Sequence, residues 1–410
     1  MPKQKEMLNL FKKIKAEFLG KKILLVGLGL QGGGEGVAKF LLKAGSKLTI
    51  TDLRPKKDFT RFLKKFAKKR VKFIFGRHRF SDFKASDIII KNPAVSEASP
   101  FIKYARKIGK PVLTETQIFF DLVPREKIIG VTGTKGKTTT AMLLTHLLKS
   151  RFKVELVGNI PGRSALESLA GLKKFPDFFV YELSSFNLEG LRVSPKYAII
   201  INIFPDHLNR YKSFNEYKKV KSNIFKYQKR GDFLWFERKN SFSSDIAGKV
   251  ALSFGISDRE VKKRLKSFKP AEGRLENLGK IKGALLINDT TSTNPGATLF
   301  GIAQIQKRLK IKSRRVILIA GGENKKLKYG EFSKKIKGLK KVILIPGSAS
   351  DLIKGKNILR VKTLKDAVKK AFEIAKKGDS ILFSPASASF NAFKNEFERG
   401  RAFKKIVKSL

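Results

Sequence analysis

The chain contains 410 residues, 41% of them hydrophobic, and carries 89 lysines and arginines against 34 aspartates and glutamates. This length predicts two or three domains with well-filled cores. The lack of cysteine excludes disulfides, thiolate metal sites and a cysteine nucleophile. No apolar run approaches the length of a membrane span, and the N-terminus lacks the apolar core of a signal peptide, so we expect a cytoplasmic protein.

The formal net charge of +55 favours anionic partners. Nucleic acid is one candidate, because phosphate backbones bind clustered lysines and arginines. The lysines are nevertheless spread over the whole chain, and no aromatic-flanked basic motif of the RNA-binding kinds is present. We therefore expect small anionic substrates and keep a nucleic-acid partner as the less favoured alternative.

The first part of the chain predicts a doubly wound parallel sheet, with strands at 22–26, 47–52, 71–75, 87–90 and 111–114 and a helix near 36–44. Gly27-Leu-Gly29-Leu-Gln-Gly32 follows the first strand as a G-x-G-x-x-G turn of the Rossmann type, and Asp52 ends the second strand. Such a turn lets the backbone approach a diphosphate, and the carboxylate can bind a ribose. Asn92 follows the fourth strand, where ligand loops gather. The pattern predicts a nucleotide site without saying which nucleotide, so an NAD-dependent oxidoreductase is one interpretation.

A second α/β unit begins with a buried strand at 127–132 and a phosphate-binding loop of the form G-T-x-G-K-T at 133–138. The glycines let backbone N–H groups turn inward, and the N-terminus of the following helix attracts anions. Lys137 can reach the outer phosphates and Thr138 can hold Mg²⁺. Val131 stands where the longer G-x-x-x-x-G-K-[ST] pattern has glycine, so the loop is a shorter cradle. A nucleic-acid-binding P-loop NTPase is a second interpretation.

The later strands of this unit, expected at 154–157, 178–181, 197–202 and 233–236, end in polar side chains. Glu182 is expected to share Mg²⁺ with Thr138, because that ion prefers oxygen ligands. His207 follows the third of these strands and is the histidine best placed to ligate a metal or contact a phosphoryl oxygen. His146 is expected in helix packing and His78 in a solvated turn.

A third α/β unit has strands expected at 284–288, 316–320, 342–346 and 380–384, followed by hydroxyl-rich and glycine-rich loops that suit a carboxylate or phosphate. The predicted fold class is therefore α/β in three domains. An N-terminal Rossmann-like domain spans 1–115, a central P-loop domain with a parallel sheet spans 116–270, and a C-terminal Rossmann-like domain spans 271–410.

These segments together resemble the Mur ligases, ATP-dependent enzymes that add amino acids to the peptidoglycan precursor. The resembling segments are 27–34, 132–139, 158–162, 182–189, 206–211, 217–225, 288–298 and 384–403. They run in order through nearly the whole chain, and the last is the most specific. The resemblance implies an ADP-forming ligase that adds D-glutamate to UDP-N-acetylmuramoyl-L-alanine through an acyl phosphate, working as a monomer.

The resemblance also implies roles for individual residues. The implied ATP-binding residues are Gly133, Thr134, Lys135, Gly136, Lys137, Thr138, Thr139, Arg274, Asp289 and Lys325. A pair of Mg²⁺ ions would be held by Thr138, Glu182, His207 and Lys221, where Lys221 matches the lysine that the family carbamylates and a carbamate supplies oxygen ligands. The implied catalytic residues are Lys137, His207 and Lys221. The substrates would contact Gly29, Leu30, Gln31, Asp52, Arg54, Asn92, Asn159, Ser184, Thr293, Ser389 and Phe390.

The chain departs from the family pattern at three places. No counterpart of the G-x-H-N-x-x-N segment, which helps to hold adenine, is found between Lys221 and Arg274. The usual P-H-R is Glu272-Gly-Arg274, and D-S-K-A-T is replaced by residues 289–293, in which Thr291 stands at the lysine position. A Mur-type ligase for another amino acid therefore remains an alternative.

Overall fold

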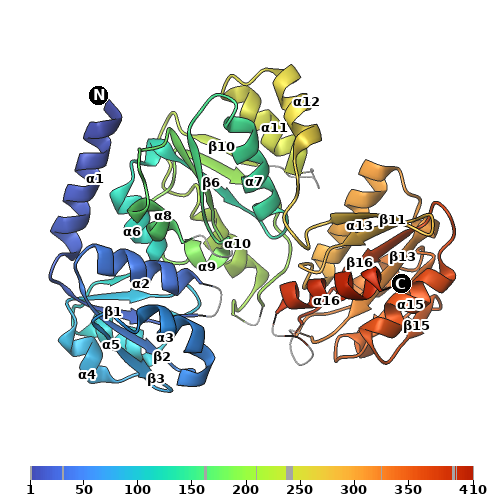
Figure 1. Cartoon of the computed structure of the whole chain (residues 1–410), viewed down its shortest axis with the longest axis horizontal. Helices are drawn as coiled ribbons and strands as arrows, with labels where there is room; N and C mark the ends of the chain where they lie inside the picture. The colour runs from blue at the N-terminus through green and yellow to red at the C-terminus, as the bar shows by residue number, and fades with distance from the viewer. Residues whose placement is uncertain are drawn as a thin grey trace.

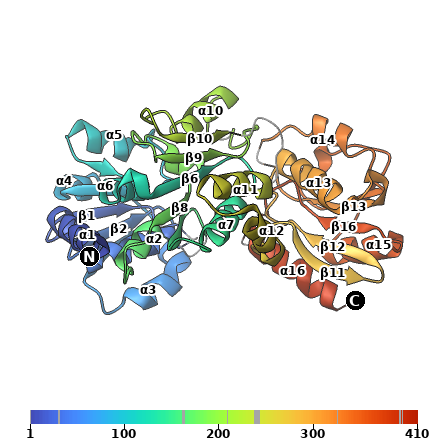
Figure 2. The same ribbon diagram turned by 90° about the horizontal axis from the view of Figure 1, so that it is seen from above.

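The computed structural model describes residues 2–29, 32–160, 164–208, 210–236, 243–324, 326–389, 393 and 395–409. Three α/β domains follow one another along the chain, each built around one sheet (Figure 1). Seen from above, the central domain lies between the other two (Figure 2). The predicted fold class of three α/β domains is confirmed.

The N-terminal sheet is parallel throughout, with the strand order β3-β2-β1-β4-β5. Its strands are β1 (Lys22–Val26), β2 (Lys47–Asp52), β3 (Val71–Phe75), β4 (Ile88–Lys91) and β5 (Val112–Leu113). Its helices are α2 (Gly33–Lys43), α3 (Thr60–Phe66), α4 (Phe80–Ala85) and α5 (Pro100–Lys107). A helix that the sequence patterns did not identify, α1 (Pro2–Phe18), precedes the sheet.

The central sheet is also parallel, with the order β10-β9-β6-β8-β7. Its strands are β6 (Ile128–Thr132), β7 (Val154–Gly158), β8 (Phe178–Glu182), β9 (Tyr197–Ile200) and β10 (Phe233–Phe236). Its helices are α6 (Glu115–Leu122), α7 (Lys137–Leu148), α8 (Ala165–Ala170), α9 (Ser185–Leu188), α10 (Phe214–Ser222), α11 (Ser243–Ser253) and α12 (Asp258–Ser267). Because β6 is the middle strand, the loop after it lies between the loops that follow β8 and β9.

The C-terminal sheet has the order β11-β12-β16-β13-β14-β15 and is parallel except for the β11–β12 pair. Its strands are β11 (Glu276–Ile281), β12 (Ala284–Asn288), β13 (Val316–Gly321), β14 (Lys341–Ile345), β15 (Ile358–Arg360) and β16 (Ser380–Phe383). Its helices are α13 (Pro295–Leu309), α14 (Gly330–Lys335), α15 (Leu364–Ile374) and α16 (Glu396–Lys408). Lys282 (φ 50°) and Gly283 (φ 79°) form the two-residue β11–β12 turn, whose positive φ values match the twist of a hairpin.

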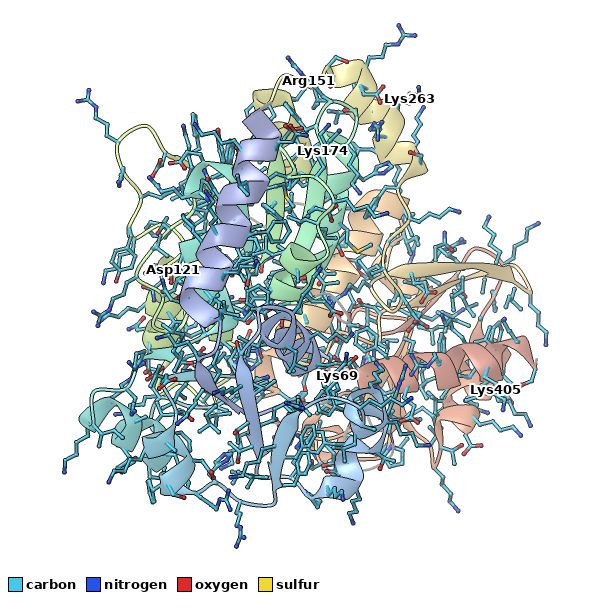
Figure 3. The ribbon with its side chains drawn as sticks, turned by 60° about the vertical axis from the view of Figure 1, so that its left-hand side comes forward. Lys69, Asp121, Arg151, Lys174, Lys263 and Lys405 are labelled. Carbon is cyan, nitrogen blue, oxygen red and sulfur yellow. The ribbon has the colours of Figure 1, made fainter. Side chains whose placement is uncertain are left out.

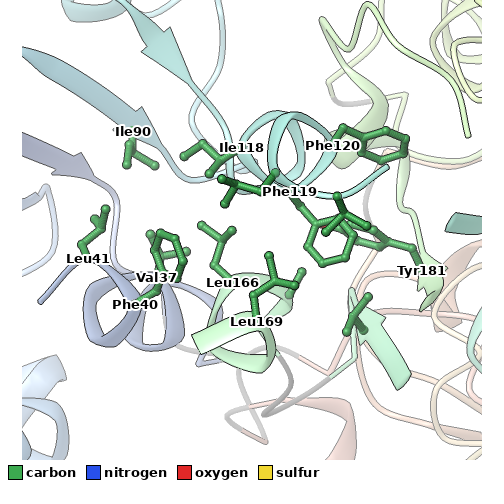
Figure 4. Close-up of a cluster of buried hydrophobic side chains, with 14 of the residues drawn as sticks. Val37, Phe40, Leu41, Ile90, Ile118, Phe119, Phe120, Leu166, Leu169 and Tyr181 are labelled. Atoms are coloured by element: carbon green, nitrogen blue, oxygen red, sulfur yellow. The ribbon is translucent and has the colours of Figure 1, made fainter. Parts of the chain in front are cut away.

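One hydrophobic core extends from the N-terminal domain into the central domain, with α6 between the two sheets. Figure 4 shows the side chains that meet there: Val37, Phe40, Leu41, Ile90, Ile118, Phe119, Phe120, Leu166, Leu169 and Tyr181. The C-terminal domain has separate cores that draw their buried members from its own residues. The first two domains are therefore packed as one body, and the third has a core of its own.

Charged side chains cover all three domains. In Figure 3 Lys69, Arg151, Lys174, Lys263 and Lys405 lie on different parts of the surface, and each is exposed. The basic charge is thus distributed, as the sequence predicted, rather than confined to one segment. Within the described ranges, every helix is too short or too polar to cross a bilayer.

Candidate active site

The phosphate loop connects β6 to α7 and is shaped by Gly136, which caps the helix with φ 89°. A side chain at that φ is strained, which accounts for the glycine. Lys137 opens α7, and its Nζ folds back to donate to the carbonyls of Gly133 (3.0 Å) and Thr134 (3.1 Å). Burial lowers the Lys137 pKa, and the Glu182 charge opposes that effect. The loop therefore holds the ammonium group of Lys137, which the sequence predicted to bind the ATP phosphates, against its own carbonyls.

Asn202, a buried polar residue at the end of the strand expected at 197–202, braces this loop. Its Oδ1 accepts from the backbone N–H groups of Thr134 (3.1 Å) and Lys135 (3.0 Å), and its Nδ2 donates to the Lys135 carbonyl (2.9 Å). Thr134 Oγ1 donates to the Phe204 carbonyl at 3.1 Å. Two amides of the cradle are thus held by the segment after β9, and the Thr134 side chain fastens the loop to that segment.

Lys221 on α10 contacts the phosphate loop from inside the protein. Its side chain is 1% exposed, and Nζ donates to the Gly133 carbonyl at 2.8 Å, the same oxygen that Lys137 contacts. Burial, and then the charge of Lys137, hold the Lys221 pKa well below its usual range. Nζ also lies 4.9 Å from the centre of the Tyr217 ring. Lys221 is therefore a buried amine that holds its proton less tightly than an exposed lysine does.

Two buried oxygen atoms near the loop fit a metal ion. Thr138 Oγ1 and Glu182 Oε2 lack a hydrogen-bond partner in the described part of the chain, and their side chains are 3% and 1% exposed. The other Glu182 oxygen accepts from Asn159 Nδ2 at 3.4 Å. A hydroxyl and a carboxylate are ligands that Mg²⁺ prefers, and an unpaired buried carboxylate oxygen is costly without a cation. Thr138 and Glu182 therefore fit the predicted Mg²⁺ role.

His207 lies in the loop after β9 with an unusual φ of 52°. Its backbone N–H donates to Asp206 Oδ1 (2.9 Å), and its Nε2 is 3.7 Å from Asp206 Oδ2. Its ring centre is 4.9 Å from that of Phe186. Across the described ranges, His, Asp and Glu side chains do not gather in groups of three that could hold a metal.

The C-terminal domain contacts the phosphate loop at Lys135. The Lys135 Nζ lies 2.7 Å from Ser292 Oγ and 3.4 Å from Asp289 Oδ1, both in the C-terminal domain. Next to this contact is a cavity of about 250 Å³ at the junction of the two domains. Its walls include the charged or polar residues Lys135, Thr139, Arg274 and Asp289 and the apolar residues Leu143, Leu265, Phe268, Pro270 and Phe300. Burial lowers the Lys135 pKa, and the Asp289 charge opposes this effect.

In the N-terminal domain, Asp52 stabilises the glycine-rich turn. Its Oδ2 accepts from the backbone N–H groups of Leu28 (2.8 Å) and Gly29 (3.4 Å), and its Oδ1 accepts from that of Arg54 (2.9 Å). The Asn92 side chain closes the same corner, since a Cβ on Gly27 would lie 3.2 Å from it. The structure therefore brings these predicted substrate residues together, with the carboxylate already bonded to the backbone.

The expectation of a solvated turn around His78 was wrong. His78 is partly buried, with Nδ1 2.8 Å from Thr51 Oγ1 and its ring centre 5.2 Å from that of Phe101. Burial lowers its pKa, and the Asp52 charge opposes this effect. The neighbouring arginines suggested exposure, but the rings of Phe83 on α4 and of Phe101 on α5, the latter 23 positions away, lie against the imidazole.

Arg210 was not singled out from the sequence, although it lies in the D-H-L-N-R-Y segment. It ion-pairs with Glu189 (2.5 Å) and donates to the N-terminal domain at the carbonyls of Ala94 (2.8 Å) and Pro93 (3.1 Å). Its guanidinium carbon also lies 4.5 Å from the centre of the Phe186 ring. Arg210 thus joins the His207 loop to the loop that carries Asn92.

The remaining predicted substrate residues fall in several places. Ser184 caps α9 by accepting from Asn187 N at 3.2 Å, Thr293 is half-buried, and Ser389 is 5% exposed. Arg399, which the sequence reasoning missed, is buried and ties the loops after β12 and β16 by donating to the carbonyls of Thr290 (3.0 Å) and Ala388 (3.1 Å). Leu30, Gln31, Lys325 and Phe390 lie outside the described residues.

A parallel sheet with a phosphate loop, buried oxygen ligands and a further domain contacting that loop define a nucleotide-dependent enzyme that acts between domains. Comparison with known families agrees in all three parts. The chain matches the Mur ligase MurD-like N-terminal domain over residues 21–114, the Mur ligase middle domain over 131–279, and the Mur ligase glutamate ligase domain over 273–387. The chain belongs to the Mur ligase family, whose members are ATP- and Mg²⁺-dependent, ADP-forming ligases.

Individual relatives align over almost the whole chain. UDP-N-acetylmuramoylalanine-D-glutamate ligase of Roseiflexus sp. strain RS-1 is 32% identical over 474 aligned positions, covering 96% of this chain and 99% of that protein. The protein of the same name from Borreliella afzelii strain PKo is 34% identical over 461 positions, with the same coverage. Both alignments are longer than the 410 residues of this chain, so the relatives contain segments that it lacks.

Solved structures share the fold. UDP-N-acetylmuramate-alanine ligase MurC from Thermotoga maritima has a TM-score of 0.58 at 20% identity and covers 95% of this chain and 99% of that one. MurF ligase from Thermotoga maritima in complex with ADP has a TM-score of 0.58 at 16% identity, with 96% of each chain covered. The predicted resemblance and fold are confirmed.

Proposed function

We propose that this chain is the ligase that adds D-glutamate to UDP-N-acetylmuramoyl-L-alanine in peptidoglycan precursor synthesis, consuming ATP and releasing ADP. The observation that carries the proposal is the near-complete alignment, at 32% and 34% identity, with two relatives that bear the name of this activity. The MurD-like match of the N-terminal domain agrees with it. The reaction activates the L-alanyl carboxylate as an acyl phosphate, which the amine of the amino acid then attacks with release of phosphate.

The protein's part in this reaction is to position and neutralise anions. Lys137 would leave the loop carbonyls that it contacts and bind the outer phosphates, which brings its charge to the phosphoryl group in transfer. Thr138 and Glu182 would hold a Mg²⁺ ion, which when bound neutralises phosphate charge. Asn202 keeps the loop in shape while Lys137 moves.

We further propose that Lys221 becomes carbamylated and, with His207, serves a second Mg²⁺ ion. The neutral amine would attack carbon dioxide, forming an N–C bond and losing one proton to solvent, so that a cation becomes an oxygen ligand. The burial and lowered pKa of Lys221 support this step, because only a neutral amine is nucleophilic. A ¹³C carbamate resonance in protein labelled with bicarbonate would test it, and a K221R variant that keeps that resonance would exclude Lys221 as its source.

The remaining assignments follow the same pattern. Arg274, Asp289, Thr139 and the apolar cavity walls would hold the nucleoside end of ATP, in the absence of a recognisable G-x-H-N-x-x-N segment. Lys325 would also contribute to the ATP site. Gly29, Leu30, Gln31, Asp52, Arg54 and Asn92 would bind the UDP end, Asn159 and Ser184 the middle of the precursor, and Thr293, Ser389 and Phe390 the amino acid. We propose domain boundaries of 1–115, 116–270 and 271–410, a monomer and a cytoplasmic location.

The proposal is tested by phosphate release from ATP in the presence of UDP-N-acetylmuramoyl-L-alanine, with D-glutamate compared against other amino acids. We expect release to require both the precursor and D-glutamate. Stimulation by another amino acid alone would identify a sibling ligase, and stimulation by nucleic acid but not by the precursor would contradict the ligase.

The matched variants are K137A and K149A. Lys149 follows the other end of α7 and is exposed, so K149A should retain activity. K137A should reduce turnover by at least about a thousandfold, in the range for loss of a group that stabilises transition-state charge. Circular dichroism would confirm that both variants are folded, and unchanged phosphate release by folded K137A would remove the cradle from the mechanism.

A further inference from the structure

Lys135 belongs to the phosphate loop, yet its ammonium group makes its side-chain contacts in the C-terminal domain. Nζ lies 2.7 Å from Ser292 Oγ, 3.4 Å from Asp289 Oδ1 and 3.5 Å from Thr291 Oγ1, and the side chain is 11% exposed. Lys137, two residues further on, instead folds onto carbonyls of its own loop. The two lysines of the loop therefore contact different partners: the Lys137 side chain bonds to its own loop, and the Lys135 side chain bonds to the C-terminal domain.

Asp289 is a buried carboxylate whose charge is balanced from another domain. Its own domain supplies the uncharged donors Leu275 N (3.3 Å to Oδ1) and Ser384 Oγ (2.9 Å to Oδ2), together with Ser292 Oγ. In the described residues, Lys135 is the cationic side chain within ion-pair distance, and the Asp289 side chain is 0% exposed. A buried charge without a counter-charge is strongly destabilising. The contact of this loop with the central domain therefore depends on Lys135.

Position 291, where the related motif has a lysine and this chain has a threonine, lies within the same contact. Thr291 occupies the place of the lysine in the related D-S-K-A-T motif, and its hydroxyl donates to the Gly273 carbonyl at 2.9 Å. Its oxygen is 3.5 Å from Lys135 Nζ, so the ammonium group from the phosphate loop lies beside position 291. A positive charge is thus present beside position 291, but it belongs to Lys135 of the central domain rather than to the C-terminal domain.

We propose that Lys135 is a positioning residue that supplies, from the phosphate loop, the positive charge that loop 289–293 lacks at position 291. It thereby docks that loop against the cradle and sets the amino-acid side of the site against the phosphate being transferred. This inference rests on the proposed function. It explains how a chain without a lysine at 291 brings the two halves of the reaction together, and it gives Lys135 a task separate from phosphate binding.

The surrounding charges support this role. Asp289 draws the ammonium group toward the C-terminal domain, whereas Arg274 and Lys137 repel it from the cavity and the cradle. ATP phosphates between these cations would relieve the repulsion, so nucleotide binding and docking of the loop should reinforce each other. A lysine placed at 291 would reach the same carboxylate from within the C-terminal domain.

The test relocates the charge in the full-length protein. K135M should raise the KM for D-glutamate about tenfold or more, and by a larger factor than it raises the KM for ATP. K135M/T291K should bring the D-glutamate KM back to within about threefold of the parent value. K135R, which keeps the positive charge, should raise the D-glutamate KM less than K135M does, and K149M, which removes an exposed lysine after the same helix, should change nothing.

Small-angle X-ray scattering with ADP and Mg²⁺ gives a readout that does not require turnover. We expect K135M to have a larger radius of gyration than the parent, and T291K to reverse the increase. A K135M that raises only the KM for ATP, or that T291K does not restore in either measurement, overturns the proposal. If the parent lacks ligase activity with every amino acid, the proposed function fails, while scattering still decides whether Lys135 docks the domain.

Discussion

The two domain junctions of this molecule are held by different kinds of contact. Between the first two domains lies a continuous apolar core in which side chains of α2, α6 and α8 interdigitate (Figure 4). Between the second and third domains lie a polar contact centred on Lys135 and Asp289 and a cavity of about 250 Å³. Apolar burial is strong and insensitive to direction, whereas a few polar contacts can be exchanged for contacts with a ligand.

The difference indicates which part of the enzyme moves. Separating the first two domains would expose a core, so the glycine-rich turn after β1 and the phosphate loop should keep a fixed distance. In the described residues the third domain shares no buried apolar core with the central domain, and its polar contacts with the phosphate loop are made by Lys135, so it can separate more readily than the first. We therefore expect the amino-acid side to close onto a preformed pair of nucleotide sites.

The strongest test of this comparison removes a ring from each kind of core. Phe119 on α6 is 0% exposed and packs edge-on against Phe179 and Tyr181, with ring centres 5.2 and 4.9 Å away. F119A should cost about 3–5 kcal/mol of unfolding free energy in the joined first two domains. The single tryptophan, Trp235, lies in the central domain, so its fluorescence in urea reports on that unit.

The matched variant is F332A, which removes a ring that is 1% exposed in the core of the third domain. It should lower the midpoint followed by circular dichroism and leave the fluorescence midpoint unchanged. If F332A shifted the tryptophan transition as much as F119A does, the three domains would unfold as one unit and the comparison would fail.

A smaller effect is expected where two helices cross the first junction. A Cβ on Gly36 of α2 would lie 2.1 Å from Ser164 Cβ, whereas a Cβ on Gly33 of the same helix would have no atom within 4 Å. G36A should therefore cost about 1–3 kcal/mol through overpacking. G33A is the control and should change stability by less than about 0.5 kcal/mol. Equal tryptophan midpoints for the two variants would show that α2 and α8 are not closely packed in solution.

The smallest effect concerns a buried carboxyl group at the same junction. Glu115 accepts from Ser164 Oγ (2.5 Å) and Leu166 N (3.1 Å), and burial raises its pKa above the ordinary 4.5. The folded state therefore holds this proton more tightly than the unfolded state, so its contribution to stability falls as the pH rises above about 4.5. E115Q should flatten that fall in urea unfolding measured from pH 5 to 8. A fall of the same slope in E115Q would mean that Glu115 is already ionised in the folded state at pH 5.

Much of the fold could be predicted from the sequence because buried parallel strands are short apolar runs bounded by turns. The strand of the phosphate loop and its neighbours are of this kind. β11 was missed because its residues, Glu276–Ile281, are mostly polar and partly exposed, and β15 because it has only three residues. The polar face of α1 hid the apolar side chains, such as Leu10 and Phe18, that pack into the shared core.

The site divides in the same way. Lys137, Thr138 and Glu182 follow from a local motif and from a polar residue at the end of a strand. The brace by Asn202, the reach of Lys135 to Asp289 and the contact of Arg210 with Pro93 join residues that are 67, 154 and 117 positions apart. Tertiary packing alone brings such pairs together, so no pattern in the sequence could have predicted them.

The separate core of the third domain has a consequence for how this enzyme could be changed. A domain joined to its neighbour mainly by polar contacts can be replaced without rebuilding a shared interior. Grafting the C-terminal domain of a relative after residue 270 would require a matching partner for Lys135 at the new junction, but no repacking of Phe119 and its neighbours. The first two domains share a core and cannot be exchanged in this way. A change in the amino acid that is added is therefore expected to arise from exchange or change of the third domain.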